Sequence, residues 1–236
     1  MTKTEVVRVS QLDWPALGDE LDRWGFAVTP PLLDEGQCRE LSELFEVDDA
    51  FRSTVVMSRH AFGEGTYRYF ADPLPTVVQQ LRVELYEPLA QIANEWAAQL
   101  GTGAFPDTLE GLLEVCAAAG QHRPTPLLLR YWAGGYNCLH QDLYGEVAFP
   151  LQVTIMLSVP DEDFTGGENV LVEQRPRAQS RPVVARLGRG EALLFPTRDR
   201  PVPGKRGPKR VGMRHGVSTV HSGERTTLGV IFHNAE

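Results

Sequence analysis

The feature that most constrains the fold is a change of sequence pattern at Pro126. From residue 127 onward, short apolar segments alternate with turns rich in Gly and Pro, which predicts β-strands rather than helices. We expect about eight strands, near residues 127–132, 137–143, 150–158, 168–173, 182–187, 191–196, 213–220 and 225–233. Many short antiparallel strands with turns between them are typical of a jelly roll.

The residues before Pro126 predict helices instead. Apolar side chains recur at helical spacing in four segments, 10–24, 35–46, 75–101 and 107–119. Pro88 is expected to kink or split the third helix, and residues 52–72 fit a short strand pair or an irregular lid. The sequence therefore predicts an α+β fold, in which a helical support region (1–124) and a jelly-roll core (125–236) form one continuous structural domain.

Composition argues against several classes of protein. The apolar content of 42% and the charged content of 23% are ordinary for a globular protein, and no apolar run is long enough to span a bilayer. Residues 1–8 lack the apolar segment of a secretory signal. Three cysteines without metal-type spacing (Cys38, Cys116 and Cys138) suit a reducing compartment. We expect a cytoplasmic protein with no membrane partner.

The net charge of −8 hides a basic stretch. Residues 173–215 hold 12 Lys and Arg against 3 Asp and Glu. A basic stretch on an otherwise acidic chain is typical of contact with a polyanion, and the alternative is a set of solvated strand faces and a charged loop. Within it, residues 198–210 are rich in Pro, Gly and charge and are expected to form an exposed, mobile loop.

His140 and Asp142 lie two residues apart in a predicted strand. Because side chains alternate faces along a strand, the imidazole and the carboxylate are expected to point the same way. Such a pair supplies two ligands of the facial triad that binds non-haem Fe(II). His215 is the favoured third ligand, because its competitor, His221, is predicted to lie at a hairpin turn around Ser222-Gly223.

The last predicted strand carries an arginine that alternation places on the same face as Thr227. If that face lines the barrel, Arg225 is a buried cation and needs an anionic partner. A dicarboxylate cosubstrate would supply one, held by the paired N–H groups of Arg225 and the hydroxyl of Thr227. The alternative partner is a structural carboxylate.

Taken together, these residues resemble the Fe(II)/2-oxoglutarate-dependent dioxygenase superfamily. The segment 164–168 resembles a turn of its prolyl-hydroxylase-like members, and 139–142 is similar to the metal motif of AlkB-type oxidative demethylases. More closely, residues 127–235 resemble a bacterial group of oxygenases for oxidative demethylation of damaged DNA. The matching words are Leu-His-Gln-Asp-Leu-Tyr-Gly (139–145), Glu-Gln-Arg-Pro-Arg (173–177), Arg-His-Gly-Val-Ser (214–218) and Ile-Phe-His (231–233).

The resemblance implies a double-stranded β-helix with Fe(II) bound by His140, Asp142 and His215. It also implies O2 and 2-oxoglutarate as cosubstrates, with Tyr131 hydrogen-bonded to the distal carboxylate of 2-oxoglutarate. A tyrosine that serves only as part of the core is the alternative. Asn137, just before the metal strand, is expected to face cosubstrate or substrate.

The activity that the resemblance implies is hydroxylation of a C–H bond by an oxidoreductase. The leading substrate is an alkylated nucleobase in single-stranded or damaged DNA, with the Lys and Arg of 173–215 on its phosphates. A hydroxylase of a protein side chain or small molecule is the rival, favoured by the acidity of the chain and the lack of an evident aromatic base clamp. A jelly-roll protein that binds metal or ligand without turnover is the non-enzymatic alternative.

Overall fold

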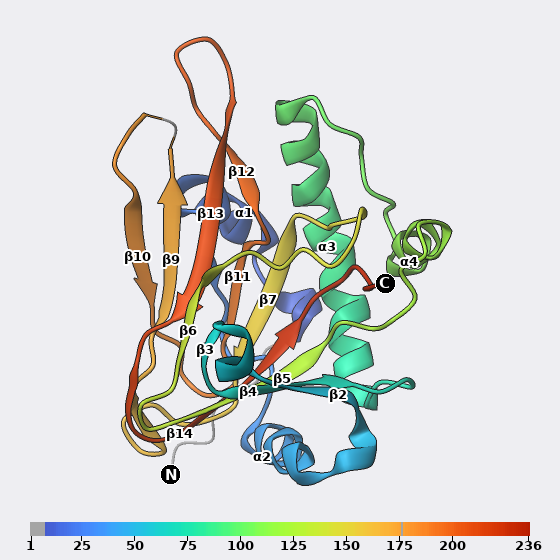
Figure 1. Ribbon diagram of the computed structural model, residues 1–236. Coiled ribbons are helices and arrows are strands. Elements are labelled where there is room, and N and C mark those ends of the chain that lie inside the picture. Colours follow the sequence, from blue (N-terminus) through green and yellow to red (C-terminus); the bar gives the residue numbers. More distant parts are fainter. Residues whose placement is uncertain (1–7, 176) are drawn as a thin grey trace.

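The computed structural model describes residues 8–175 and 177–236 (Figure 1). Two antiparallel sheets face each other, and helices cover the outer face of the larger one. Strands in the larger sheet follow the order β1-β11-β7-β14-β5-β4-β2, with β8 paired to β14. The smaller sheet follows the order β10-β9-β13-β6-β3, with β12 paired to β13. Residues 1–7, on which the expectation about a secretory signal rests, and Pro176 of the basic stretch lie outside the described residues.

Each strand predicted after Pro126 has an observed counterpart. The larger sheet contains β1 (Ala27–Val28), β2 (Phe51–Val56), β4 (Thr66–Phe70), β5 (Leu127–Trp132), β7 (Leu151–Met156), β8 (Phe164–Gly166), β11 (Ala192–Pro196) and β14 (Val220–Val230). The smaller sheet contains β3 (Gly63–Glu64), β6 (Tyr136–His140), β9 (Asn169–Gln174), β10 (Arg181–Ala185), β12 (Asp199–Val202) and β13 (Lys209–Val217). The mixed fold with antiparallel sheets is confirmed.

The helices are α1 (Trp14–Trp24), α2 (Glu35–Glu43), α3 (Thr76–Leu100) and α4 (Leu109–Ala118). Short 3₁₀ turns lie at η1 (Val9–Gln11), η2 (Leu44–Glu46), η3 (Asp48–Ala50) and η4 (Met57–His60). Asp13 caps α1 and Asp34 caps α2, each by accepting a backbone N–H of the first turn. Pro88 lies inside α3, which continues through it, so the predicted split does not occur. No helix in the described part of the chain is long and apolar enough to cross a bilayer.

Alternation along the strands divides the apolar side chains between two cores. On β14, Leu228 and Val230 face outward and pack with the buried residues of α3, including Leu85 and Leu89. Residues on the opposite faces pack between the sheets, where Met156 of β7 joins residues of both sheets. The helices therefore close one side of the larger sheet, and the space between the two sheets is left for the site.

The region before residue 124 contributes more than helices. β2 and β4 pair with each other, and β4 pairs with β5, so residues 51–70 extend the larger sheet. The strand-pair alternative for this region is confirmed. Two aromatic side chains of β4, Tyr67 and Tyr69, contact each other with ring centroids 5.5 Å apart.

Residues 198–210 were expected to form an exposed, mobile loop, and this is wrong at the two ends of the segment, although the connection between them is exposed. β12 pairs with β13 from Asp199 to Val202, so the segment is a hairpin. Its anchor is Arg200, which is buried and donates a hydrogen bond of 2.5 Å to the buried carboxylate of Glu173 on β9. An ion pair between strands far apart in sequence overrides the local turn signals of Pro and Gly.

The predicted turn of the last hairpin is also displaced. β14 begins at Val220, and the connection from β13 is Ser218-Thr219 rather than Ser222-Gly223. Gly223 lies within β14 with a φ of +77°, and a side chain there would collide with the carbonyl oxygen of Asp163. The glycine therefore permits a close approach of β8 and not a reversal of the chain.

We expect His233 to make the protein less stable in mild acid. Its side chain is fully buried, its Nδ1 accepts a hydrogen bond from the backbone N–H of Phe149 (3.2 Å), and burial lowers its pKa to about 4. Between the unfolded-state pKa of about 6.5 and this value, only the unfolded state takes up the proton, so stability falls as pH falls. The loss between pH 6.5 and pH 5 should be about 2 kcal/mol.

Urea titrations at the two pH values measure this loss. His233→Gln, which does not titrate there, should lose less than the wild type over the same interval by about that amount. Equal losses in the two proteins would exclude His233 as the group responsible.

Candidate functional site

A cavity of about 420 Å³ lies between the two sheets. The residues that the sequence analysis favours for binding the metal or the cosubstrate all line this cavity: Tyr131, Asn137, His140, Asp142, His215, Arg225 and Thr227. The two histidines come from the smaller sheet, whereas Arg225, Thr227 and Tyr131 come from the larger one. The fold therefore brings residues 131–142 together with residues 215–227, and each of these two segments contributes to both sheets.

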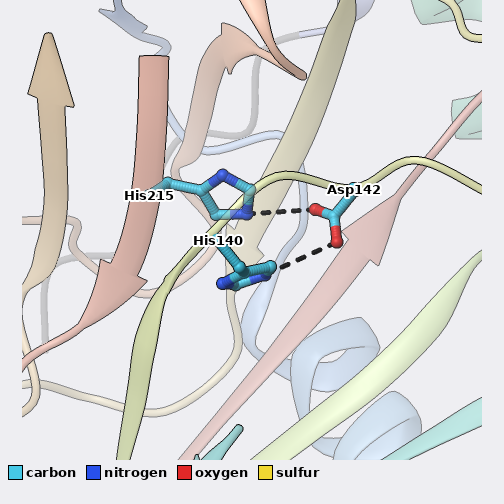
Figure 2. Close-up of side chains that lie close together, drawn as sticks. All are labelled: His140, Asp142 and His215. Carbon is cyan, nitrogen blue, oxygen red and sulfur yellow. Dashed lines mark ion pairs between the residues drawn. The ribbon is translucent and has the colours of Figure 1, made fainter. Parts of the chain in front are cut away.

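His140, Asp142 and His215 converge on one point (Figure 2). The Nε2 of His215 is 3.0 Å from one carboxylate oxygen of Asp142, and the Nε2 of His140 is 3.4 Å from the other. One ligand atom of each residue lies within 4.8 Å of the others. Ligands bound at right angles about 2.1 Å from a metal are about 3.0 Å apart, which is close to the separation between His215 and Asp142.

Strand register accounts for the two histidines. On the antiparallel pair β6 and β13, His140 is the direct partner of His215, and the register then shifts before Val217. Their rings lie 4.3 Å apart between centroids. A side chain at Gly216 would come within 2.6 Å of the carbonyl oxygen of Asn137, so only glycine allows the two strands to approach this closely.

Asp142 reaches the site in a different way from the one predicted. β6 ends at His140, so the carboxylate is presented by the segment after the strand and not by strand alternation. Gln141 fixes that segment by donating to the backbone carbonyls of Arg198 (3.1 Å) and Met213 (2.8 Å). Tyr144 donates a hydrogen bond of 2.8 Å to Asp142 Oδ1, which orients the carboxylate.

The electrostatics keep the carboxylate ionised. Burial by itself would raise the pKa of Asp142, but the two imidazoles beside it outweigh burial and hold that pKa well below its usual value. Burial lowers the pKa of His215 despite the attraction of Asp142. For His140 burial acts in the same direction but is outweighed by Asp142, so its pKa is raised.

A hydrogen bond orients the ring of His140 for metal binding, whereas the Nδ1 of His215 is buried without a partner. The Nδ1 of His140 is 2.8 Å from the carbonyl oxygen of Cys138, to which it can donate. With its proton on Nδ1, His140 turns the lone pair of Nε2 toward Asp142. These three side chains could therefore hold a divalent metal with imidazole and carboxylate preference. His221, the competing histidine, is exposed near the start of β14 and does not line the cavity.

Arg225 is fully buried and lacks a counter-ion. Its Nη2 donates to the neutral side-chain oxygen of Asn169 (2.8 Å), while Nε and Nη1 have no hydrogen-bond partner. Among the described residues no carboxylate forms an ion pair with Arg225. The alternative partner, a structural carboxylate, is therefore not observed. Burial lowers the pKa of Arg225 to about 10, against the attraction of Tyr131 and Glu168. Two donors of a buried cation are thus left for a ligand.

Tyr131 and Thr227 complete the polar surface around Arg225. Tyr131 is the register partner of Arg225 on β5, and the guanidinium carbon lies 5.5 Å from the centre of its ring. Asn137 donates a hydrogen bond of 3.2 Å to the Tyr131 hydroxyl oxygen. Burial raises the pKa of Tyr131 to about 12, against the attraction of Arg225, so the hydroxyl keeps its proton.

Sequence reasoning missed several residues of the cavity. Tyr144 orients Asp142, Asn169 orients Arg225, and Phe195 packs edge-on against His215 with ring centroids 4.8 Å apart. Gln152 also lines the cavity, from the middle of an apolar strand. Tyr144 could have been found, because it is part of the matched word 139–145, but the partners of the others depend on the tertiary fold.

The basic stretch 173–215 divides into two groups. Six of its basic residues form ion pairs within the protein: Arg175 and Arg200 with Glu173, Arg186 with Glu168, Arg189 with Glu35, and Arg198 and Arg210 with Asp199. The basic residues without such a pair include Lys205, Arg206 and Lys209, which are exposed around the connection between β12 and β13. The hairpin that carries them projects from the body of the protein (Figure 1).

Solved structures with this fold include several oxygenases. The chain matches a 2OG-Fe(II) oxygenase family oxidoreductase of Burkholderia pseudomallei with a TM-score of 0.58 and 16% identity, over 100% of this chain and 99% of that one. A prolyl hydroxylase of Trichoplax adhaerens, in complex with a hypoxia inducible factor peptide fragment, matches with a TM-score of 0.55 and 14% identity, over 94% and 89%. A Pseudomonas putida prolyl-4-hydroxylase gives 0.53 and 15%, over 94% and 100%. At these identities the likeness concerns the fold.

Sequence comparison identifies the family. Two uncharacterised proteins from two strains of Mycobacterium tuberculosis are each 53% identical to the chain over 167 residues, which is 70% of this chain and 72% of theirs. Residues 65–235 match the model of a family described as oxygenase, catalysing oxidative methylation of damaged DNA. This match includes β4 and all of the cavity residues named above. The chain therefore belongs to this family of oxygenases, and it is an oxidoreductase.

Proposed function

We propose that the chain is an Fe(II)- and 2-oxoglutarate-dependent dioxygenase that hydroxylates a C–H bond, built on a double-stranded β-helix formed by its two facing sheets. One observation carries the proposal: a His-Asp-His cluster and a buried guanidinium with two free donors line the same cavity. The first group suits a metal with three open positions, and the second suits a carboxylate. Membership in an oxygenase family does not support the alternative of a jelly-roll protein that binds metal or ligand without turnover.

The residues present fit both groups. His140, Asp142 and His215 would hold Fe(II), since one ligand atom of each lies within 4.8 Å of the others. Arg225 would bind the distal carboxylate of 2-oxoglutarate through its free N–H groups, and Tyr131 and Thr227 line the same cavity with hydroxyls that can add hydrogen bonds. Fe(II), 2-oxoglutarate and O2 together supply the oxidising chemistry, with succinate and CO2 as co-products.

The side chains of the protein would position the reactants. Asp142 stays ionised between the two imidazoles, and Tyr144 holds one of its oxygens in place. Arg225 is fixed by Asn169 and by the face of Tyr131, so its free donors are oriented before a ligand arrives. Phe195 packs edge-on against the ring of His215 and limits its movement.

For the substrate we propose an alkylated nucleobase in single-stranded or damaged DNA. Hydroxylation of an N-methyl carbon gives a hemiaminal, which loses formaldehyde and leaves the demethylated base. The family description and the unpaired basic residues of the β12–β13 hairpin support this substrate. The net charge of −8 favours the rival, a protein side chain or small molecule. Succinate formation in the presence of methylated oligonucleotides, peptides or amino acids tests the proposal, and stimulation by oligonucleotides alone would support it.

The metal site can be tested with two histidine variants. His215→Ala removes a ligand, so affinity for Mn(II), measured by calorimetry as an oxygen-stable substitute for Fe(II), should fall more than about 100-fold. His221→Ala is the matched control and should bind Mn(II) like the wild type, because His221 lies outside the cavity. A loss in the control and not in His215→Ala would assign the third ligand to His221.

The proposed cosubstrate site predicts a specific defect in Arg225→Lys. Lysine keeps the charge but loses the paired donors, so the apparent KM for 2-oxoglutarate should rise about 10- to 100-fold while Mn(II) affinity is kept. Arg200→Lys changes an equally buried arginine that does not line the cavity, and its KM should stay close to that of the wild type. An unchanged KM in Arg225→Lys would remove this residue from the cosubstrate site.

Contact with DNA phosphates predicts a salt effect. Arg206→Glu should weaken binding of single-stranded DNA irrespective of its sequence and lower the slope of log affinity against log salt by about 1. Arg39→Glu makes the same charge change on α2, at an exposed position, and should leave the slope unchanged. An electrophoretic titration across a salt series measures both, and absence of binding by the wild type at low salt would refute the DNA substrate.

A further inference from the structure

Besides Arg225 and the Nδ1 of His215, the cavity contains a further buried polar group without a partner. Gln152 lies on β7, between Leu151 and Val153, which pack in the core beneath the helices. Alternation turns Gln152 the other way, and its side chain lines the cavity. Its exposed fraction is 3%, and Nε2 has no hydrogen-bond partner.

An amide in this position costs stability unless a ligand satisfies it. A buried donor without an acceptor loses its bonds to water and gains nothing in return. Leucine has nearly the same volume and would suit the apolar strand without that loss. As with Arg225, a free donor at the cavity wall therefore points to a ligand.

The position of Gln152 distinguishes its ligand from the cosubstrate. Thr227 is the register partner of Met156, and Val230 is the partner of Val153, so Gln152 lies at the end of the β7–β14 pair away from Arg225. About 20 Å of β14 separates the Cα atoms of Arg225 and Ile231, so Arg225 and Gln152 belong to opposite ends of this strand pair. This placement favours a second molecule as the ligand of Gln152.

Gln152 also lies beside the metal ligands. Its register partner on β11 is Phe195, whose ring packs against His215. A molecule that contacts the amide would thus be near the proposed metal, on the side away from Arg225. This is where the organic substrate must bind, because its reacting carbon has to approach the metal.

We propose that Gln152 recognises the polar edge of the substrate and determines its specificity, the substrate being an alkylated nucleobase; this inference rests on the proposed function. A primary amide offers a donor and an acceptor side by side, and glutamine pairs in this way with adjacent N–H and ring-nitrogen groups of a base. Around the same cavity, Phe62, Leu139 and Leu143 are apolar and exposed, with Phe62 47% exposed. A base removed from its stack is bound by such a combination of apolar faces and edge hydrogen bonds.

Gln152→Leu tests the inference through melting temperature and oligonucleotide affinity. If Gln152 were only structural, both quantities would fall together. Removal of the unsatisfied amide should raise the melting temperature by a few degrees. The same change should weaken binding of a methylated oligonucleotide, measured by fluorescence anisotropy with Mn(II) and 2-oxoglutarate present, about 10-fold or more. Gln152→Glu, which keeps the shape but loses the donor, should also bind more weakly.

Thr197→Val is the matched control. Thr197 is buried, its hydroxyl also lacks a partner, and it does not line the cavity, so its loss should leave affinity unchanged. A lower melting temperature in Gln152→Leu, or unchanged oligonucleotide affinity, would overturn the inference while the proposed function stands. Failure of the wild type to bind any methylated oligonucleotide would instead overturn the proposed nucleobase substrate. The proposed role of Gln152 in recognising a base would then be overturned as well.

Discussion

The antiparallel register between β6 and β13 is the constraint on which the site depends. It sets His140 directly across from His215, and a shift of one residue would turn one imidazole to the other face of the sheet. Gly216 permits the approach, because any side chain there would meet the backbone of Asn137. On its other edge β13 pairs with β9 along its length, so the position of His215 is fixed by two neighbours. The geometry of the cluster is thus a property of the backbone, and Asp142 has only to reach it.

The backbone arrangement fixes the geometry of the histidine pair, but it does not by itself satisfy Arg225. Its charge is removed from water, and the only protein group that accepts a hydrogen bond from it in the described residues is the neutral oxygen of Asn169. The face of Tyr131 offsets part of the cost, but a ring quadrupole is weaker than a carboxylate. A buried cation with free donors is stabilised most by an anion that enters the cavity. The site is therefore built to be completed by a ligand.

The sequence predicted the strands and the converging residues because both depend on local pattern. Apolar alternation located the eight predicted strands after Pro126 but missed the short strands β8 and β12, and the same alternation turned Arg225 and Thr227 inward. It failed where tertiary contacts decide: Asp142 lies beyond the end of β6, and the β12–β13 hairpin is held by a buried ion pair between Arg200 and Glu173. Gln152 escaped notice for a related reason, since one polar residue in an apolar strand has no meaning until the cavity beside it is known.

The smaller sheet carries the two histidines proposed to bind the metal and also the exposed basic residues, which relates the two proposed contacts with the substrate. His215 and Lys209 lie on one strand, so their Cα atoms are about 20 Å apart along β13. A phosphate at the tip of the hairpin therefore belongs to a nucleotide several positions from the one that enters the cavity. The cavity itself presents a neutral amide and apolar side chains at the substrate end, which suits an uncharged base edge better than a phosphate. On the proposed DNA substrate, the charged hairpin would therefore contact the backbone, and the neutral end of the cavity would receive one base.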